Sequence, residues 1–93
     1  KLSKLAEEDL RFISAKTIEE WGRPQAQKYV SLLHETMTQL ANGPNIGKNR
    51  PVLFNNAKSF PAQKHMIFYW KSKTGIEVAR ILHQRMDPLA AFE

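Results

Sequence analysis

The chain has 93 residues, of which 42% are hydrophobic and 25% charged, so we expect one globular domain spanning residues 1–93. It contains no cysteine, which excludes disulfides and thiolate metal sites. No apolar stretch approaches the length of a membrane span, and we therefore expect a cytoplasmic protein without a membrane partner.

The net charge of +5 is confined to the second half of the chain. Residues 1–46 carry six basic and six acidic side chains, whereas residues 47–93 carry eight basic side chains against Glu77, Asp87 and Glu93. Such asymmetry indicates an anionic partner, either nucleic acid or an acidic protein segment. The alternative is a solvated basic surface that only keeps the protein soluble.

The first half of the chain predicts two helices. Ser3 is a suitable N-cap for a helix over Lys4–Trp21, whose apolar residues recur at steps of three and four. Gly22 ends this helix, and Pro24 suits the first turn of a second one, which Asn42-Gly43-Pro44 stops. Because the connection is so short, the two helices are expected to pack as an αα-hairpin.

The middle of the chain is expected to be mostly irregular. Residues 45–51 combine Gly, Pro and Asn in the pattern of a loop. A short strand is predicted within residues 57–62, where Pro61 restricts it to an edge or an end. Gln63 and Lys64 then turn the chain.

Residues 65–88 predict a β-hairpin. Met66–Trp70 is apolar at consecutive positions, which is typical of a central strand covered on both faces. The helices would cover one face, and either the tail Leu89–Phe92 or a partner the other. In the second strand, simple alternation places Arg80 in a row with three apolar residues, so its guanidinium must be paired or must face a cleft. That alternation assigns one face to Ile76, Val78, Arg80 and Leu82, and the other to Glu77, Ala79, Ile81 and His83.

Helices followed by strands predict an α+β domain, with an αα-hairpin packed on one face of a small antiparallel sheet of three to four strands. A strand ahead of Lys1 is a further expectation, because the chain begins without an initiator Met.

The residues suggest no metal site and no cofactor, since the three histidines lack ligand-like spacing. What remains is a basic group on or near the sheet. It could clamp phosphate, or use a histidine as acid or base. Alternatively, His83 and Arg85 only cap a strand end and pair with Asp87. The basic group consists of Lys58, Lys64, His65, Arg80, His83 and Arg85.

The stretches H-M-I-F-Y-W and I-E-V-A-R-I-L-H-Q-R-M-D-P, within residues 65–88, resemble the ParE family of type II toxin–antitoxin toxins, in the ParE/RelE superfamily. A-E-E-D-L, W-G-R-P-Q-A and L-A-N-G-P occur in matching order over residues 6–44, so the resemblance covers nearly the whole chain. It implies a RelE-like fold, the same architecture that the residues predict.

The resemblance also implies partners. ParE-type toxins are associated with binding DNA gyrase and blocking replication, and the whole basic group named above becomes the expected target contact. An acidic, partly disordered antitoxin would neutralise the toxin in a hetero-oligomer. Its expected contacts are the apolar sheet residues Phe60, Met66, Phe68 and Trp70.

Two alternatives stay open. RelE-type relatives cut messenger RNA in the ribosome, and Lys58, Lys64, His83 and Arg85 would then surround the scissile phosphate. Such relatives tend to carry a catalytic Tyr or His beyond the last strand, where Phe92 is the only aromatic residue here. Binding is therefore favoured over catalysis. The third possibility is a member that binds its antitoxin but is no longer toxic.

Overall fold

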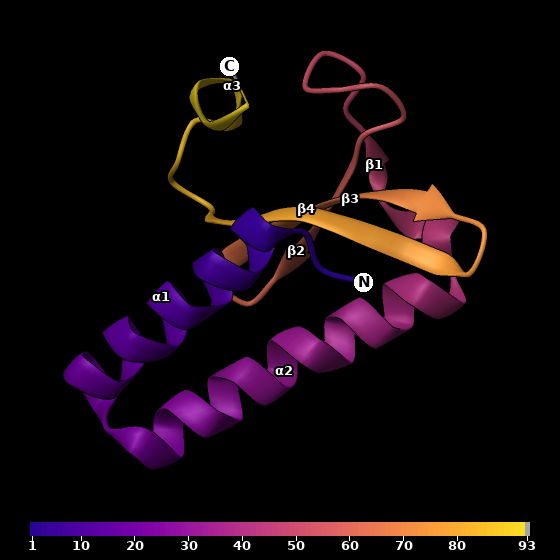
Figure 1. Ribbon diagram of the computed structural model, residues 1–93. Coiled ribbons are helices and arrows are strands. Elements are labelled where there is room, and N and C mark those ends of the chain that lie inside the picture. Colours follow the sequence, from indigo (N-terminus) through magenta and orange to yellow (C-terminus); the bar gives the residue numbers. More distant parts are fainter. Residues whose placement is uncertain (93) are drawn as a thin grey trace.

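The computed structural model describes residues 1–92, in which two long helices lie against one face of a four-stranded antiparallel sheet (Figure 1). Helix α1 spans Lys4–Trp21 and helix α2 spans Arg23–Asn42. The predicted α+β architecture and the αα-hairpin are therefore confirmed. Gly22 joins the helices with φ of 90°, a left-handed conformation that glycine adopts without steric cost.

The strands follow one another in space as they do in sequence, in the order β1-β2-β3-β4. Their bounds are Lys48–Asn49 for β1, Lys58–Ala62 for β2, His65–Ser72 for β3 and Gly75–His83 for β4. Strand β3 pairs with both β2 and β4, so its predicted central place is confirmed. Strand β1 lies in the segment that the sequence indicated as loop, and the one-turn 3-10 helix η1 (Pro44–Ile46) begins one residue before that segment.

The predicted alternation along β4 is wrong, because the strand contains a β-bulge. Tyr69 pairs with Val78, whereas the preceding Phe68 pairs with Arg80, which leaves Ala79 as the extra residue. The bulge shifts the side-chain alternation by one position. As a result Val78 and Ile81 both enter the core beneath the helices, and Leu82 belongs to the opposite face.

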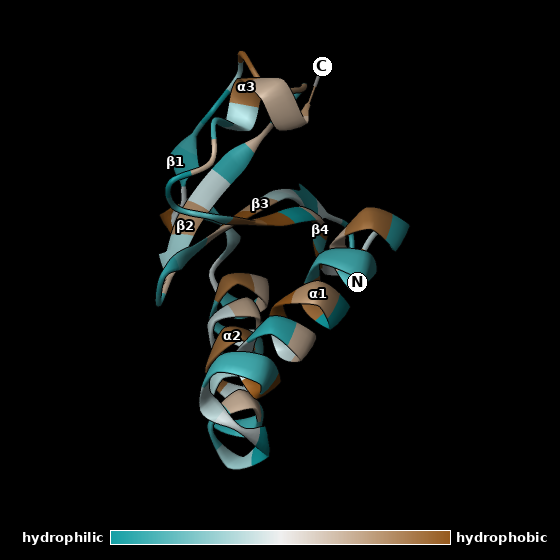
Figure 2. Ribbon diagram, turned by 90° about the vertical axis from the view of Figure 1, so that its left-hand side faces the viewer, coloured by the Kyte–Doolittle hydropathy of each residue, from teal (hydrophilic) through white to brown (hydrophobic). Residues whose placement is uncertain are grey.

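The main core lies between the helix pair and the sheet (Figure 2). Its centre is formed by Leu33 and Leu40 of α2 and by Ile67 and Tyr69 of β3, all fully buried. A second, smaller core lies on the opposite face of the sheet. It joins Phe68 and Leu82 to the loop residues Leu53 and Ala57, and Ala91 and Phe92 pack against it. The short helix α3 (Pro88–Ala91) carries this tail, so the cover expected from either the tail or a partner is provided by the tail together with the loop.

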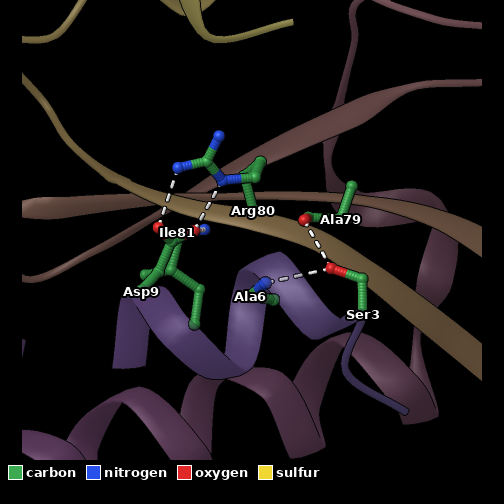
Figure 3. Close-up of polar contacts among 6 residues, drawn as sticks. All are labelled: Ser3, Ala6, Asp9, Ala79, Arg80 and Ile81. Carbon is green, nitrogen blue, oxygen red and sulfur yellow. Dashed lines mark hydrogen bonds and ion pairs between the residues drawn. The ribbon is translucent and has the colours of Figure 1, made fainter. Parts of the chain in front are cut away.

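The outer edge of β4 is covered by the chain in front of α1. Leu2 forms a parallel bridge with Val78, and the backbone N–H of Ser3 donates to the Val78 carbonyl at 2.9 Å. The Ser3 hydroxyl donates to the Ala79 carbonyl at 2.7 Å and also accepts the Ala6 N–H as the N-cap of α1 (Figure 3). A strand ahead of Lys1 would lie outside the described residues.

Candidate functional site

Four of the predicted target-contact residues meet at one end of the sheet, where β3 begins and β4 ends. His65 pairs with His83 across the two strands, and their ring centroids are 5.3 Å apart. The N–H of Gln84 donates to the Lys64 carbonyl at 3.0 Å, which holds the segment after β4 against the β2–β3 turn. We call Lys64, His65, His83 and Arg85 the strand-end cluster.

His65 is tied to the helix pair through a tyrosine. The Lys64 N–H donates to the Tyr29 hydroxyl oxygen at 3.0 Å, and the same hydroxyl lies 2.7 Å from His65 Nδ1. Because the oxygen already accepts one bond, its proton is available for a neutral Nδ1. Burial lowers the pKa of His65 to about 4, with a further contribution from His83, while Asp9 opposes the shift. Burial likewise raises the pKa of Tyr29. His65 is therefore neutral at physiological pH.

The solvent side of the cluster is cationic. Lys64 and Arg85 are exposed, whereas His83 is half-buried. The Arg85 N–H donates to His83 Nδ1 at 3.2 Å, which orients the imidazole and leaves its Nε2 for another partner. The cluster thus combines two exposed positive charges with two oriented imidazole rings, an arrangement suited to an anionic or polar partner.

Arg80 is paired within the protein, which is one of the two environments that the sequence predicted for its guanidinium. Its Nε donates to Asp9 Oδ2 and its Nη2 to Asp9 Oδ1, both at 2.8 Å, and the Ile81 N–H donates to the same carboxylate at 3.0 Å (Figure 3). The side chains of Arg80 and Asp9 are only 19% and 14% exposed. The hydrogen bond that Arg80 donates to Asp9 raises the pKa of Arg80, so the guanidinium stays charged and paired with a carboxylate of α1.

Lys58 lies apart from the strand-end cluster. It pairs with Tyr69, four residues along β3 from His65, which corresponds to about 13 Å of strand. Its Nζ donates to Asn49 Oδ1 of β1 at 2.7 Å. The predicted basic group therefore divides into the strand-end cluster, the internally paired Arg80 and the separate Lys58.

The four predicted antitoxin contacts lie on both faces of the sheet. Phe60 is partly buried against the main core beneath the helices. Met66 packs on the second core, in which Phe68 is only 2% exposed, and Trp70 contacts Phe54 of the loop with ring centroids 5.9 Å apart. Phe68 is thus already covered by other parts of the chain.

Sequence reasoning missed two residues that organise the site, Asp9 and Tyr29. Asp9 lies within A-E-E-D-L, but its acidic neighbours made it indistinguishable from a first-turn dipole residue. Tyr29 was indistinguishable from an ordinary apolar position on the inner face of α2. Both act through contacts across more than 30 positions of sequence, which no local pattern reveals.

Two general features concern the described part of the chain. Residues 1–92 contain no group of three or more His, Cys, Asp or Glu side chains placed to hold a metal ion. Within the same residues, no helix combines the length and the apolar character needed to cross a bilayer.

An αα-hairpin on a small antiparallel sheet, with a basic cluster at the sheet's end, defines this chain as a small two-layer α+β domain. The family described as "ParE toxin of type II toxin-antitoxin system, parDE" matches residues 1–88. The chain therefore belongs to the ParE family of type II toxins.

Individual relatives agree with this assignment. The chain is 34% identical over 87 residues to Toxin ParE1 of Mycobacterium tuberculosis H37Rv, covering 92% of this chain and 89% of the relative. It is 33% identical to Toxin ParE of Escherichia coli (92% and 84% covered) and 30% identical to Toxin ParE1 of Caulobacter vibrioides (97% and 93%). The fold matches a chain of the "Chromosomal ParDE TA system from P. aeruginosa" with a TM-score of 0.75, at 20% identity and with 88% and 90% covered.

Proposed function

We propose that this toxin arrests bacterial growth by binding DNA gyrase through the strand-end cluster, without catalysing a reaction of its own. The observation that carries the proposal is that the cluster combines imidazole rings already fixed by hydrogen bonds with exposed cationic side chains. Both imidazoles are held by hydrogen bonds within the chain, while Lys64 and Arg85 point their charge to solvent. This is the arrangement of a preformed docking surface, in which exposed charges steer the encounter. Gyrase acts on DNA in the cytoplasm, which is the location that the proposal requires.

The test is a supercoiling assay with purified toxin, run together with an assay for trapped, cleaved DNA. Wild type should inhibit supercoiling, and the double variant Lys64→Ala/Arg85→Ala should lose most of that inhibition. Lys16→Ala/Lys28→Ala is the matched control, since it removes the same charge from exposed positions on α1 and α2. Unchanged supercoiling with wild-type toxin would exclude gyrase as the target.

We further propose that an acidic, partly disordered antitoxin neutralises the toxin in a hetero-oligomeric complex. The basic second half of the chain supports this, because Arg80 is the only basic side chain within residues 1–92 that is held in an ion pair. Coexpression with the small acidic protein encoded beside the toxin gene should yield a stable complex and restore growth. Failure of the two proteins to copurify would contradict it.

A ribosome-dependent mRNA endonuclease is the second candidate, and the facing His65 and His83 are the observation that favours it. Two imidazoles beside exposed cations could transfer protons at a phosphate. However, about 13 Å of strand separates Lys58 from the cluster, which argues against a single catalytic site that includes Lys58 together with Lys64, His83 and Arg85. Codon-positioned cleavage in a translating extract, lost in Arg85→Ala, would establish this function in place of gyrase binding.

A further inference from the structure

The face of the sheet opposite the helices is covered by aromatic rings from three separate segments. Phe92 of the tail lies 5.5 Å from Phe68 of β3 and 5.2 Å from Phe54 of the loop, measured between ring centroids. Phe54 in turn contacts Trp70 of β3 at 5.9 Å. In Figures 1 and 2 the tail and α3 lie on the side of the sheet away from both helices. The tail therefore occupies the outer face of the central strand.

Apolar contacts attach this tail to the rest of the protein. Its polar groups are satisfied locally, since Asp87 caps α3 by accepting the Leu89 N–H at 3.0 Å and the Phe92 N–H donates to Pro88 and Leu89. Among the described residues, no hydrogen bond or ion pair joins residues 88–92 to the sheet or to the loop. The connecting residues 84–87 are exposed, so the tail can leave without breaking a buried polar contact.

The surroundings of Phe68 indicate what kind of segment could replace the tail. Phe68 pairs with Ser59 of β2, which accepts a hydrogen bond from Arg50 Nε at 3.0 Å, and Lys48 of β1 pairs with the same serine. Arg50 thus contacts the strand next to Phe68, and Lys48 lies two strands away from it. Neither cation is in an ion pair within residues 1–92. A segment with one large apolar side chain and acidic neighbours complements such a surface.

We propose that the tail and the antitoxin compete for this face, so that an apolar side chain of the antitoxin takes the place of Phe92 beside Phe54 and Phe68. The proposal rests on the proposed antitoxin pairing. The closed tail shields the aromatic surface of the free toxin, and antitoxin binding releases the tail. Apparent antitoxin affinity is then reduced by the fraction of toxin whose tail is closed.

The sign of one mutational effect tests this competition. The probe is the small acidic protein encoded beside the toxin gene, titrated against the full-length toxin. Phe92→Ala weakens closure and should bind the probe more tightly, by roughly tenfold if the tail is closed about nine-tenths of the time. Leu89→Ala is the matched control, because Leu89 is on the same helix but is 52% exposed and should leave affinity unchanged. If Phe92→Ala binds the probe more weakly, the tail is itself a contact for the antitoxin. If the affinity is unchanged, the antitoxin docks elsewhere. Either result overturns the proposal.

A second measurement leaves Phe92 in place. The chain has no native cysteine, so Ala90→Cys on the exposed side of α3 accepts a single fluorophore. Release of the tail should lower the anisotropy of the label when the probe binds, even though the complex is larger. A rise in anisotropy would contradict release, while the antitoxin pairing itself would stand. A probe that binds neither labelled nor unlabelled toxin would remove the pairing and this proposal together.

Discussion

Asp9 of α1 and Arg80 of β4 form a two-pronged ion pair that fastens the first helix to the edge of the sheet, with both N···O distances at 2.8 Å. The same carboxylate also accepts the Ile81 N–H. One carboxylate thus accepts hydrogen bonds from a guanidinium and from a backbone amide next to the β-bulge. Both donors belong to β4, the edge strand of the sheet.

Removing only one partner of this pair should be strongly destabilising. Asp9→Ala leaves a largely buried guanidinium and the Ile81 N–H without their acceptor, and we expect a loss of about 3 kcal/mol in the free energy of unfolding. The double variant Asp9→Leu/Arg80→Met should recover most of that loss, because no buried charge remains. Urea denaturation measures both. A loss for the single variant below about 1 kcal/mol would show that water solvates Arg80.

The stability of the protein should fall in mild acid because of His65. Its folded pKa of about 4 lies below the ordinary value of 6.5, so the unfolded chain binds the proton more readily. This contribution to stability is complete above pH 6.5 and is lost as the pH falls toward 4. His65 is not fully buried, so we expect about 1 to 2 kcal/mol after allowing for solvent screening.

Denaturation as a function of pH checks this expectation. His65→Gln should flatten the stability profile between pH 6.5 and 4, whereas His34→Gln, at an exposed position on α2, should leave it unchanged. A wild-type profile that is flat over this range would contradict the low pKa.

Gly47 should not tolerate a side chain, because Tyr69 lies directly against its backbone. A Cβ at position 47 would overlap the Tyr69 hydroxyl and would lie 2.9 Å from two of its ring carbons. Gly47→Ala should therefore cost about 1 to 3 kcal/mol, the range typical of overpacking. Tyr69→Phe should not rescue it, since the ring contacts persist. Gly43→Ala is the control, with its nearest contacts at 3.7 Å, and thermal denaturation compares the variants.

The hydroxyl of Tyr69 should also contribute to the stability of the protein through its own hydrogen bonds. It accepts the Gly47 N–H at 3.0 Å and donates to the Pro44 carbonyl at 2.9 Å, which ties η1 to the sheet. Tyr69→Phe leaves both backbone groups without their partner, and we expect a loss of about 1 to 3 kcal/mol. Amide hydrogen exchange at Gly47 should accelerate in this variant. Unchanged protection there would contradict the role of the hydroxyl.

Lys58 and Arg85 should act independently on any target, because they lie at separate parts of the sheet. The effects of Lys58→Ala and Arg85→Ala on gyrase inhibition should add as free energies, whereas Lys64→Ala and Arg85→Ala share one surface and are expected to couple. A double-mutant cycle on inhibition constants decides this. Strong coupling between Lys58 and Arg85 would instead favour a single site around one phosphate.

The sequence by itself determined the helices and the central hairpin, because these depend on patterns local to the chain. Ser3, Gly22 and Asn42-Gly43-Pro44 mark the helix ends, and α1 begins and ends at the residues that they predict. The continuous apolar run Met66–Trp70 correctly indicated a central strand with a core on each face. The charge asymmetry and the family motifs are likewise properties of the chain alone.

Only the tertiary structure decided which face each side chain of β4 occupies and which remote residues it contacts. The bulge at Ala79 exchanged the faces of Ile81 and Leu82, so that Ile81 joins the core beneath the helices and Leu82 the opposite one. A simple alternation pattern does not reveal such an insertion. The partner of Arg80 is 71 positions away in α1, and the cover over Phe68 comes from the end of the chain. Contacts of this kind depend on packing between elements that are remote in sequence, so a periodicity read along one segment cannot reveal them.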